Sequence, residues 1–223
     1  SAIRPLRNMN VNGVIWYQGE SNATNIEIHE RLFPLLIQSW RSFFADSSLP
    51  FYYVQLSSIN RPSWPWFRDS QRTMMQQLPN TGMAVSSDLG DSLDVHPRNK
   101  QPIGERLARW ALSKHKGFEQ IVPSGPLFVG AKMQGKKMVV EFKYGKNLTT
   151  ADNQPLRTLE LAGADKVFYP AKTILKDGVL EAWSDSVQQP KFVRYAYQPF
   201  TRGNLVNSDK LPASTFLSAI SAK

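Results

Sequence analysis

The sequence contains no cysteine among its 223 residues. This absence excludes disulfide bonds, thiolate nucleophiles and cysteine-ligated metal sites together. Long apolar runs are also missing, whereas a membrane-spanning helix needs about 20 consecutive apolar residues. The first seven residues, SAIRPLR, lack the apolar stretch of a secretory signal. The sequence therefore predicts neither a membrane partner nor a signal peptide.

Dense positive charge is missing as well, although 27 Lys and Arg outnumber 18 Asp and Glu and give a net charge of +9. Residues 1–120 hold 13 basic and 10 acidic side chains, and residues 121–223 hold 14 and 8, so the excess is spread thinly. The densest basic run is Lys136-Lys137. A groove that follows nucleic-acid phosphates needs clustered charge. We therefore expect no nucleic-acid partner, and a basic surface that suits an anionic substrate or glycan.

The first half, residues 1–117, alternates short apolar segments with helical patterns, which is typical of a parallel sheet with crossover helices. The segment from Val11 to Gln18 is apolar in its centre and is interpreted as a buried strand with helices over both faces. Apolar residues spaced by three and four between Leu32 and Phe44 predict an amphipathic helix that starts or kinks at Pro34. The other predicted elements are strands at 51–56 and 82–87, a Pro/Trp-rich loop at 61–66, and helices at about 68–78 and 103–113.

After Gly117 the pattern changes to short β-type segments separated by Gly, Asp, Asn and Pro turns. Their spacing is that of an all-β sandwich. The predicted segments are 137–143, 156–161, 167–174, 179–183 and 192–197. We therefore place a linker at 118–123, between an α/β part at 1–117 and a β-sandwich-like domain at 124–223.

One histidine, His96, lies where chemistry is expected. It follows the third predicted strand, and Asp88, Asp91 and Asp94 precede it within eight residues. Loops at the carboxyl edge of an open α/β sheet hold ligands and catalysts. Nearby carboxylates orient a histidine and raise its basicity, as a general base requires. The alternative is an Asp/Gly turn with a surface histidine, and the spacing alone favours neither.

The other two histidines, His29 and His115, are interpreted as surface residues at the start of the first helical pattern and in the polar tail of the last. A single histidine among aspartates is not the multi-histidine set of a zinc site. Calcium on the aspartates stays open, although no EF-hand pattern is present. We expect neither a metal nor a cofactor.

Polar residues also follow the first predicted strand, in the segment Gln18-Gly-Glu-Ser-Asn22. Carboxyl ends of parallel strands share one sheet edge, so we expect this segment beside His96. Gly19 permits a tight turn or the close approach of a substrate. The alternative is a helix N-cap formed by Ser21 or Asn22. Ser21 is a weak nucleophile candidate, because its neighbours do not match Gly-x-Ser-x-Gly.

Two long motifs resemble a known family. They are Trp16-Tyr-Gln-Gly-Glu-Ser-Asn-Ala23, and Asp88-Leu-Gly-Asp with Asp94-Val-His-Pro-Arg-Asn-Lys100 and Gly104-Glu-Arg-Leu-Ala108. Together they resemble the sialate O-acetylesterases, SGNH-type hydrolases that remove acetyl groups from sugars. Shorter matches extend the resemblance over essentially the whole chain. It implies part of an SGNH (flavodoxin-like) three-layer α/β fold with a parallel sheet, followed by the β-sandwich-like domain.

The resemblance implies serine acyl transfer with His96 as the catalytic base. Its orienter is Asp94, by side chain or backbone carbonyl, with Asp91 as the alternative. The wider SGNH pattern has Asp three residues before the histidine, where this chain has Leu93. The residues implied to line the substrate and oxyanion pocket are Gln18, Gly19 and Glu20.

The nucleophile motif of that family, Gly-Gln-Ser-Asn, does not occur in the sequence. The expectation is a C-terminal part of the enzyme, inactive alone, whose serine lies on a missing N-terminal segment. The strand from Val11 to Gln18 then has an unpaired edge, which we predict pairs with that segment or with a second copy. The resemblance implies an O-acetylated sugar or sialic acid as substrate, and a secreted or periplasmic location.

The competing hypothesis is a non-catalytic glycan-binding module, with Trp64, Trp66 and Trp183 as stacking platforms. For Trp64 and Trp66 we favour burial as loop anchors. Glycan binding that persists in residues 121–223 alone would support the module. Should the chain alone prove active, the candidate nucleophiles near strand ends are Ser21, Ser57 and Ser58.

Overall fold

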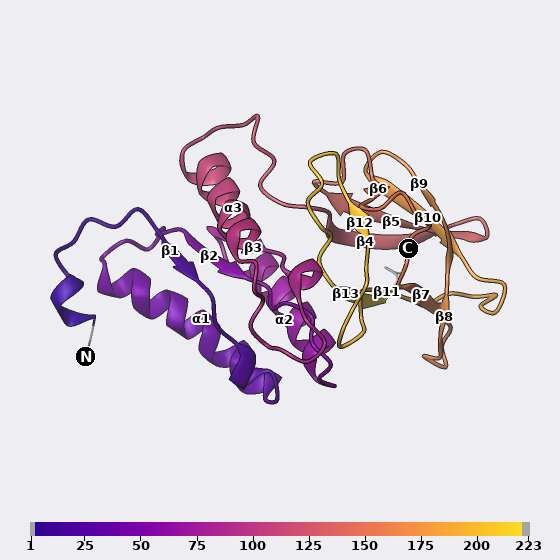
Figure 1. Cartoon of the computed structure of the whole chain (residues 1–223), viewed down its shortest axis with the longest axis horizontal. Coiled ribbons are helices and arrows are strands. Elements are labelled where there is room, and N and C mark those ends of the chain that lie inside the picture. Colours follow the sequence, from indigo (N-terminus) through magenta and orange to yellow (C-terminus); the bar gives the residue numbers. More distant parts are fainter. Residues whose placement is uncertain (1–2, 220–223) are drawn as a thin grey trace.

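The computed structural model describes residues 3–219. A parallel sheet with helices comes first along the chain, and antiparallel sheets follow (Figure 1). The predicted α/β class, with a parallel sheet and then a β part, is confirmed.

The parallel sheet has the strand order β1-β2-β3. Its strands are β1 (Val14–Trp16), β2 (Phe51–Val54) and β3 (Thr81–Ala84), and its helices are α1 (Ile26–Phe43), α2 (Trp64–Gln77) and α3 (Gln101–Trp110). Successive side chains of β2 point to opposite faces of the sheet, where they contact different helices. Phe51 and Tyr53 contact Phe33 of α1, with ring centroids 6.0 and 4.9 Å apart, while Tyr52 stacks on Trp110 of α3 at 6.2 Å. Helices therefore cover both faces of β2.

The first strand differs from its prediction. It is three residues long rather than eight, and it pairs with β2 alone among the described residues. Ile15 is 70% exposed, because α3 packs against β2 and β3 and does not reach over β1. The expected buried strand is therefore an apolar edge strand.

Helix α1 also differs, because it begins at Ile26 and continues through Pro34 instead of starting or kinking there. Its buried side chains recur every four residues, as a helix face requires. They are His29, Phe33, Ile37 and Arg41. Leu32 and Leu35 lie outside this face and are each 56% exposed.

Helix α2 begins at Trp64, within the segment predicted as a loop. Pro65 occupies the first turn, where a backbone N–H has no hydrogen-bond partner within the helix, so its absence in proline costs nothing. Helix α3 begins at Gln101 and runs into a π-helical turn, η4 (Ala111–His115).

The antiparallel half is a sandwich of two four-stranded sheets. One sheet contains β4 (Leu127–Gln134), β5 (Lys137–Lys143), β10 (Val179–Trp183) and β9 (Lys172–Leu175). The other contains β13 (Phe216–Ala219), β11 (Phe192–Tyr195), β7 (Leu159–Ala162) and β8 (Phe168–Pro170), and β6 (Thr149–Thr150) pairs with β12 (Leu205–Val206). Met138 and Val140 of one sheet meet Leu161, Val193 and Phe216 of the other in a single core. The predicted strand 167–174 is two strands, and β4, β6, β12 and β13 were not predicted.

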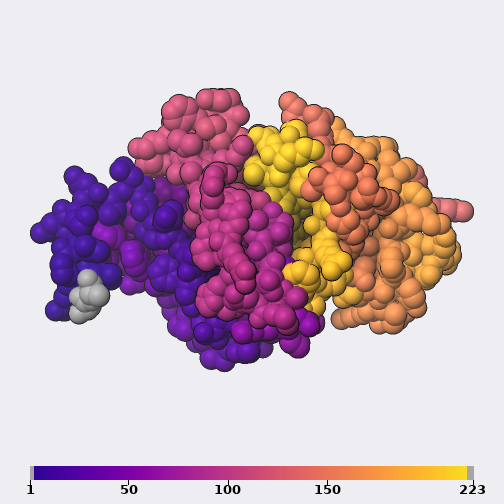
Figure 2. Space-filling view, in the orientation of Figure 1, coloured from indigo at the N-terminus to yellow at the C-terminus, as the bar shows by residue number. Residues whose placement is uncertain are grey.

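The two halves are joined through Arg68 of α2, which is fully buried. Its guanidinium donates hydrogen bonds to the carbonyls of Ala196, Gln198 and Pro199, at 3.0, 2.5 and 3.0 Å, and to the hydroxyl of Thr215 at 3.0 Å. Figure 2 shows the C-terminal residues, in yellow, between the helical half and the rest of the sandwich. The division at 118–123 stays a prediction, but the parts on either side of it are firmly packed together.

Candidate active site

The segments that follow β1 and β3 meet at the carboxyl edge of the parallel sheet and border an open cleft of about 550 Å³. The lining residues are Tyr17, Glu20, Ser21, Arg61, Val95, His96, Pro97 and Lys100. Two of the sequence-predicted site residues, Glu20 and His96, thus share one cleft. Gln18, Gly19 and the two aspartates lie beside it and do not line it.

The His96 ring is 80% exposed and lies against Asp94. One Asp94 carboxylate oxygen is 3.4 Å from His96 Nδ1 and accepts the His96 backbone N–H at 2.9 Å. That N–H, together with the imidazole and Arg98, holds the pKa of the Asp94 carboxyl below its usual value. Asp94 therefore stays ionised beside the ring nitrogen that an orienting carboxylate uses.

The other two aspartates hold the loop in place. Asp91 accepts the backbone N–H groups of Leu93 and Asp94 at 2.8 and 3.3 Å, which forms the turn before His96. Asp88 makes a bidentate pair with Arg106, with both distances 2.7 Å. The two motifs that occur together in the sequence, around Asp88 and around Arg106, are therefore joined in space.

The turn at Gly19 places the short helix η2 (Glu20–Asn22) at the cleft. Gly19 has φ +148°, and a side chain there would place Cβ 2.8 Å from the Phe67 ring. Glycine is therefore required at this position. Gln18 Nε2 donates to Asn22 Oδ1 at 3.4 Å, so the two amides on either side of the turn face one another.

His29, predicted at the surface, is 3% exposed. It lies between the rings of Phe33 and Phe67, with centroids 5.2 and 4.5 Å away, and its Nδ1 is 3.3 Å from the Asn22 amide nitrogen. The prediction was wrong because α1 begins at Ile26, which places His29 on the buried face. Burial lowers the pKa of His29 to about 4, so the ring is neutral near pH 7. The third histidine, His115, is exposed, as predicted.

The three in-chain serine candidates differ in access. Ser57 and Ser58 are 3% and 1% exposed, and the Ser58 hydroxyl donates to the Ser87 carbonyl at 2.8 Å. Ser21 is exposed and lines the cleft. Within residues 3–219 no serine hydroxyl is hydrogen-bonded to the His96 ring.

Sequence reasoning missed two cations of the cleft. The Arg61 guanidinium lies 5.3 Å from the centroid of the Trp64 ring, and Lys100 Nζ donates to the Pro97 carbonyl at 2.8 Å. Lys100 could have been identified from the sequence, because it is the last residue of the motif that begins at Asp94. The loop around Arg61 contains no such motif. These two cations share the cleft with Glu20, so the cleft suits an anionic or polar ligand.

The three tryptophans proposed as sugar platforms have different environments. Trp64 is 1% exposed and its Nε1 donates to the Ser57 carbonyl at 2.7 Å, which confirms burial. Trp66 is 54% exposed and contacts Tyr197 edge to face, so burial was wrong for this residue. Trp183 is half-buried, with Lys137 Nζ 4.9 Å from its ring centroid.

Residues 3–219 contain neither a metal-binding cluster nor a membrane-spanning helix. No group of three or more His, Asp or Glu side chains there is arranged to hold a metal ion. No helix of that part of the chain has the length and apolar character that crossing a membrane requires.

Comparison with known families gives one match over the first half. Residues 2–113 match the family described as carbohydrate esterase, sialic acid-specific acetylesterase. The match includes the parallel sheet, the turn at Gly19 and the loop of His96.

Known proteins show the same similarity. The chain is 37% identical over 147 residues to mouse sialate O-acetylesterase, covering 56% of this chain and 27% of that protein. It is 34% identical over 164 residues to the human protein of the same name, covering 64% and 31%. A crystal structure of a carbohydrate acetylesterase from Xanthomonas citri has a TM-score of 0.90 and 36% identity, covering 97% of this chain and 52% of that one. The chain thus spans about a third or less of the two curated relatives.

Proposed function

Because this chain belongs to the sialic acid-specific acetylesterase family of carbohydrate esterases, we propose that it contributes the histidine half of an enzyme that hydrolyses acetyl esters on sugars. The observation that carries the proposal is the His96–Asp94 pair, exposed at the carboxyl edge of the sheet beside Glu20. An exposed imidazole with an ionised partner on Nδ1 is the arrangement that acyl transfer to a serine requires.

In the proposed mechanism, His96 accepts the serine proton as the serine oxygen attacks the acetyl carbonyl, and then protonates the leaving sugar oxygen. Water, activated by the same ring, releases acetate from the acyl-enzyme. Asp94 orients the ring through Nδ1, which leaves Nε2 toward the serine. The 3.4 Å distance from the Asp94 carboxylate to Nδ1 favours Asp94 over Asp91, whose contacts are with backbone N–H groups.

Gln18, Gly19 and Glu20 are proposed to form the substrate and oxyanion side of the cleft. The support is local: Gly19 fixes the turn, and Glu20 lines the cleft together with Arg61 and Lys100. Arg61 and Lys100 would meet the carboxylate of an acidic sugar. An O-acetylated sialic acid is therefore the proposed substrate class, and the secreted or periplasmic location stays a proposal from the resemblance.

The serine is proposed to come from polypeptide that is not among these 223 residues and that pairs with β1. Two observations support this: the β1 edge is unpaired within residues 3–219, and the His96 ring has no serine partner there. The competing in-chain candidate is Ser21, because it lines the cleft.

Hydrolysis of a chromogenic acetyl ester tests the proposal. The 223-residue chain alone is expected to show almost no turnover, and the same residues joined to the serine-bearing segment of a relative are expected to be active. Normal turnover by the chain alone, abolished by Ser21→Ala, would instead assign the nucleophile to Ser21. Absence of turnover in the joined enzyme would contradict the proposal itself.

A second candidate function, glycan binding without catalysis, is favoured by exposed Trp66 alone. If this is the main role, Trp66→Ala abolishes retention on immobilised glycan while His96→Ala does not. Hydrolysis that is abolished by His96→Ala and retained in Trp66→Ala would instead support the esterase.

A further inference from the structure

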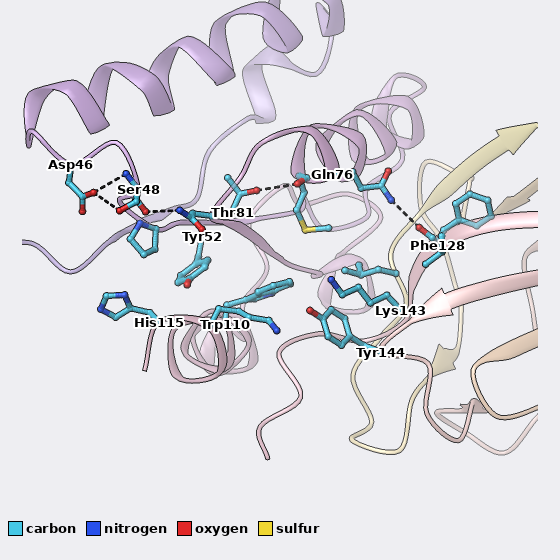
Figure 3. Close-up of a pocket in the computed structure, with 16 residues that line it drawn as sticks. Asp46, Ser48, Tyr52, Gln76, Thr81, Trp110, His115, Phe128, Lys143 and Tyr144 are labelled. Carbon is cyan, nitrogen blue, oxygen red and sulfur yellow. Dashed lines mark hydrogen bonds between the residues drawn. The ribbon is translucent and has the colours of Figure 1, made fainter. Parts of the chain in front are cut away.

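A larger cavity, of about 740 Å³, lies between the two halves and away from His96. It is bordered by the first residues of β2 and β3, by the end of α3 with η4, and by β4 and β5. Figure 3 shows Tyr52, Trp110 and His115 on one side of the space and Lys143 and Tyr144 on the other. The cavity therefore lies at the amino end of the parallel sheet, opposite the cleft, and its size is that of a small-molecule site.

The ionised side chains that line this cavity, two lysines and one aspartate, carry a net positive charge. Lys114 and Lys143 place their ammonium groups 5.7 and 5.2 Å from the centroid of the Tyr144 ring, and neither forms an ion pair within residues 3–219. The acidic residue of the lining, Asp46, already accepts the backbone N–H and the hydroxyl of Ser48, at 2.8 and 2.7 Å. Two free ammonium groups beside a hydrogen-bonded carboxylate favour an anionic ligand.

The hydroxyl of Tyr52 adds a hydrogen-bond donor to the cavity. Tyr52 is 5% exposed and lines the cavity, and its hydroxyl has no hydrogen-bond partner within residues 3–219. The hydroxyl oxygen itself is not enclosed, so it is accessible from the cavity. Burial raises the pKa of Tyr52, so the hydroxyl keeps its proton and is a donor. A ligand oxygen in the cavity would satisfy it.

The Tyr144 ring forms one wall of the cavity at a strained position. Its φ is +60°, which a bulky residue rarely adopts, and its carbonyl accepts the Asn207 side-chain amide at 3.0 Å. The ring meets Trp110 edge to face at 6.0 Å. The backbone is therefore held in an unfavourable conformation that keeps an aromatic face between the two lysines.

We propose that this cavity binds a carboxylate-bearing sugar, at a site separate from the cleft of His96. The carboxylate pairs with the ammonium groups of Lys114 and Lys143, a ring oxygen accepts the Tyr52 hydroxyl, and the sugar packs against the wall that Tyr144 forms. The anionic character follows from the cavity alone, whereas the choice of a sugar rests on the proposed function.

Calorimetric titration of the full chain with N-acetylneuraminate, and with its methyl ester, tests the proposal. The acid is expected to bind, and the ester, which lacks the charge, to bind at least about tenfold more weakly. Lys114→Met and Lys143→Met are expected to weaken binding of the acid by about tenfold each, and Tyr52→Phe by somewhat less. Both lysines are exposed, so their substitution leaves the core intact.

Lys136→Met is the control. It removes an exposed charge on the β4–β5 turn, away from both the cavity and the cleft, and is not expected to change the dissociation constant. The proposal is overturned if the unmodified chain does not bind the acid, if acid and ester bind equally, or if Lys100→Met alone abolishes binding. Hydrolysis is measured separately, so binding without esterase activity contradicts the proposed function and leaves this site standing.

Discussion

In the sandwich half, each four-stranded sheet buries its inner face against the other, and Met138, Leu161, Val193 and Phe216 are fully buried between them. In the parallel half, β2 is covered on both faces, while β1 has an open edge and Ile15 lies in solvent. All three histidines and the cleft belong to that second, incompletely covered half. The proposed active site therefore lies where the fold is least closed, and Arg68 connects that half to the closed one.

The largest expected effect tests where the chemistry lies. In the active enzyme, His96→Ala is expected to lower kcat for acetyl ester hydrolysis by about 10³-fold or more, because His96 is the group proposed to accept the serine proton. His115→Ala, an exposed histidine at the other end of the sheet, is the control and leaves kcat unchanged. Equal losses in both variants would show that the effect is general destabilisation.

The next effect tests the joint between the halves. Arg68→Met leaves the carbonyls of residues 196, 198 and 199 without their donor, and is expected to cost about 3–5 kcal/mol of unfolding free energy in urea titrations. Lys172→Met breaks an exposed pair with Asp185 and is expected to cost less than about 1 kcal/mol. A small loss for Arg68→Met would mean that the halves hold together without this residue.

The two halves are also expected to differ in how far their stability depends on acid pH, since the sandwich contains no histidine. The folded pKa of His29 is about 4, below the ordinary value of 6.5, so the unfolded chain binds a proton more readily. Stability is full above pH 6.5 and falls toward pH 4, by about 2 kcal/mol. His29→Phe, which keeps a ring between Phe33 and Phe67, is expected to flatten this pH dependence. If the pH dependence of stability is the same in His29→Phe as in the unmodified chain, groups other than His29 are responsible for it.

The smallest effect concerns the open edge. If β1 pairs with a second copy, Ile15→Lys shifts the sedimentation profile toward monomer, because a charge on an edge strand discourages pairing. Val129→Lys alters an apolar residue of β4 that is 60% exposed and is expected to leave the profile unchanged. Both variants are expected to retain stability within about 0.5 kcal/mol. A monomeric unmodified chain would contradict self-association through β1.

The features that the sequence predicted correctly are those that depend on residues close together in the chain. Strands β5 and β10 match their predicted bounds, because β5 holds a run of apolar residues between two lysines and the burial of β10 alternates along the strand. His96 and Asp94 are two positions apart, so their proximity required no tertiary information.

The errors concern features that depend on distant parts of the chain. Burial of His29 follows from the start of α1 at Ile26, and exposure of Ile15 follows from how far α3 reaches. Arg68 looks like a surface residue in sequence, because the carbonyls that receive its hydrogen bonds come about 130 positions later. The sequence could not distinguish the contacts of Asp88, Asp91 and Asp94, because these contacts depend on the geometry of the turn.

Helix α2 starts three residues after Arg61 of the cleft, and on its next turn Arg68 is fixed in the loop at 196–199. Because the acceptors in that loop are backbone carbonyls, the conformation of the loop and the position of α2 are coupled. For inheritance, we expect this to mean that the sandwich is not freely exchangeable. Recombination that replaced it with an unrelated β domain would leave a buried guanidinium without its acceptors, at a cost in stability.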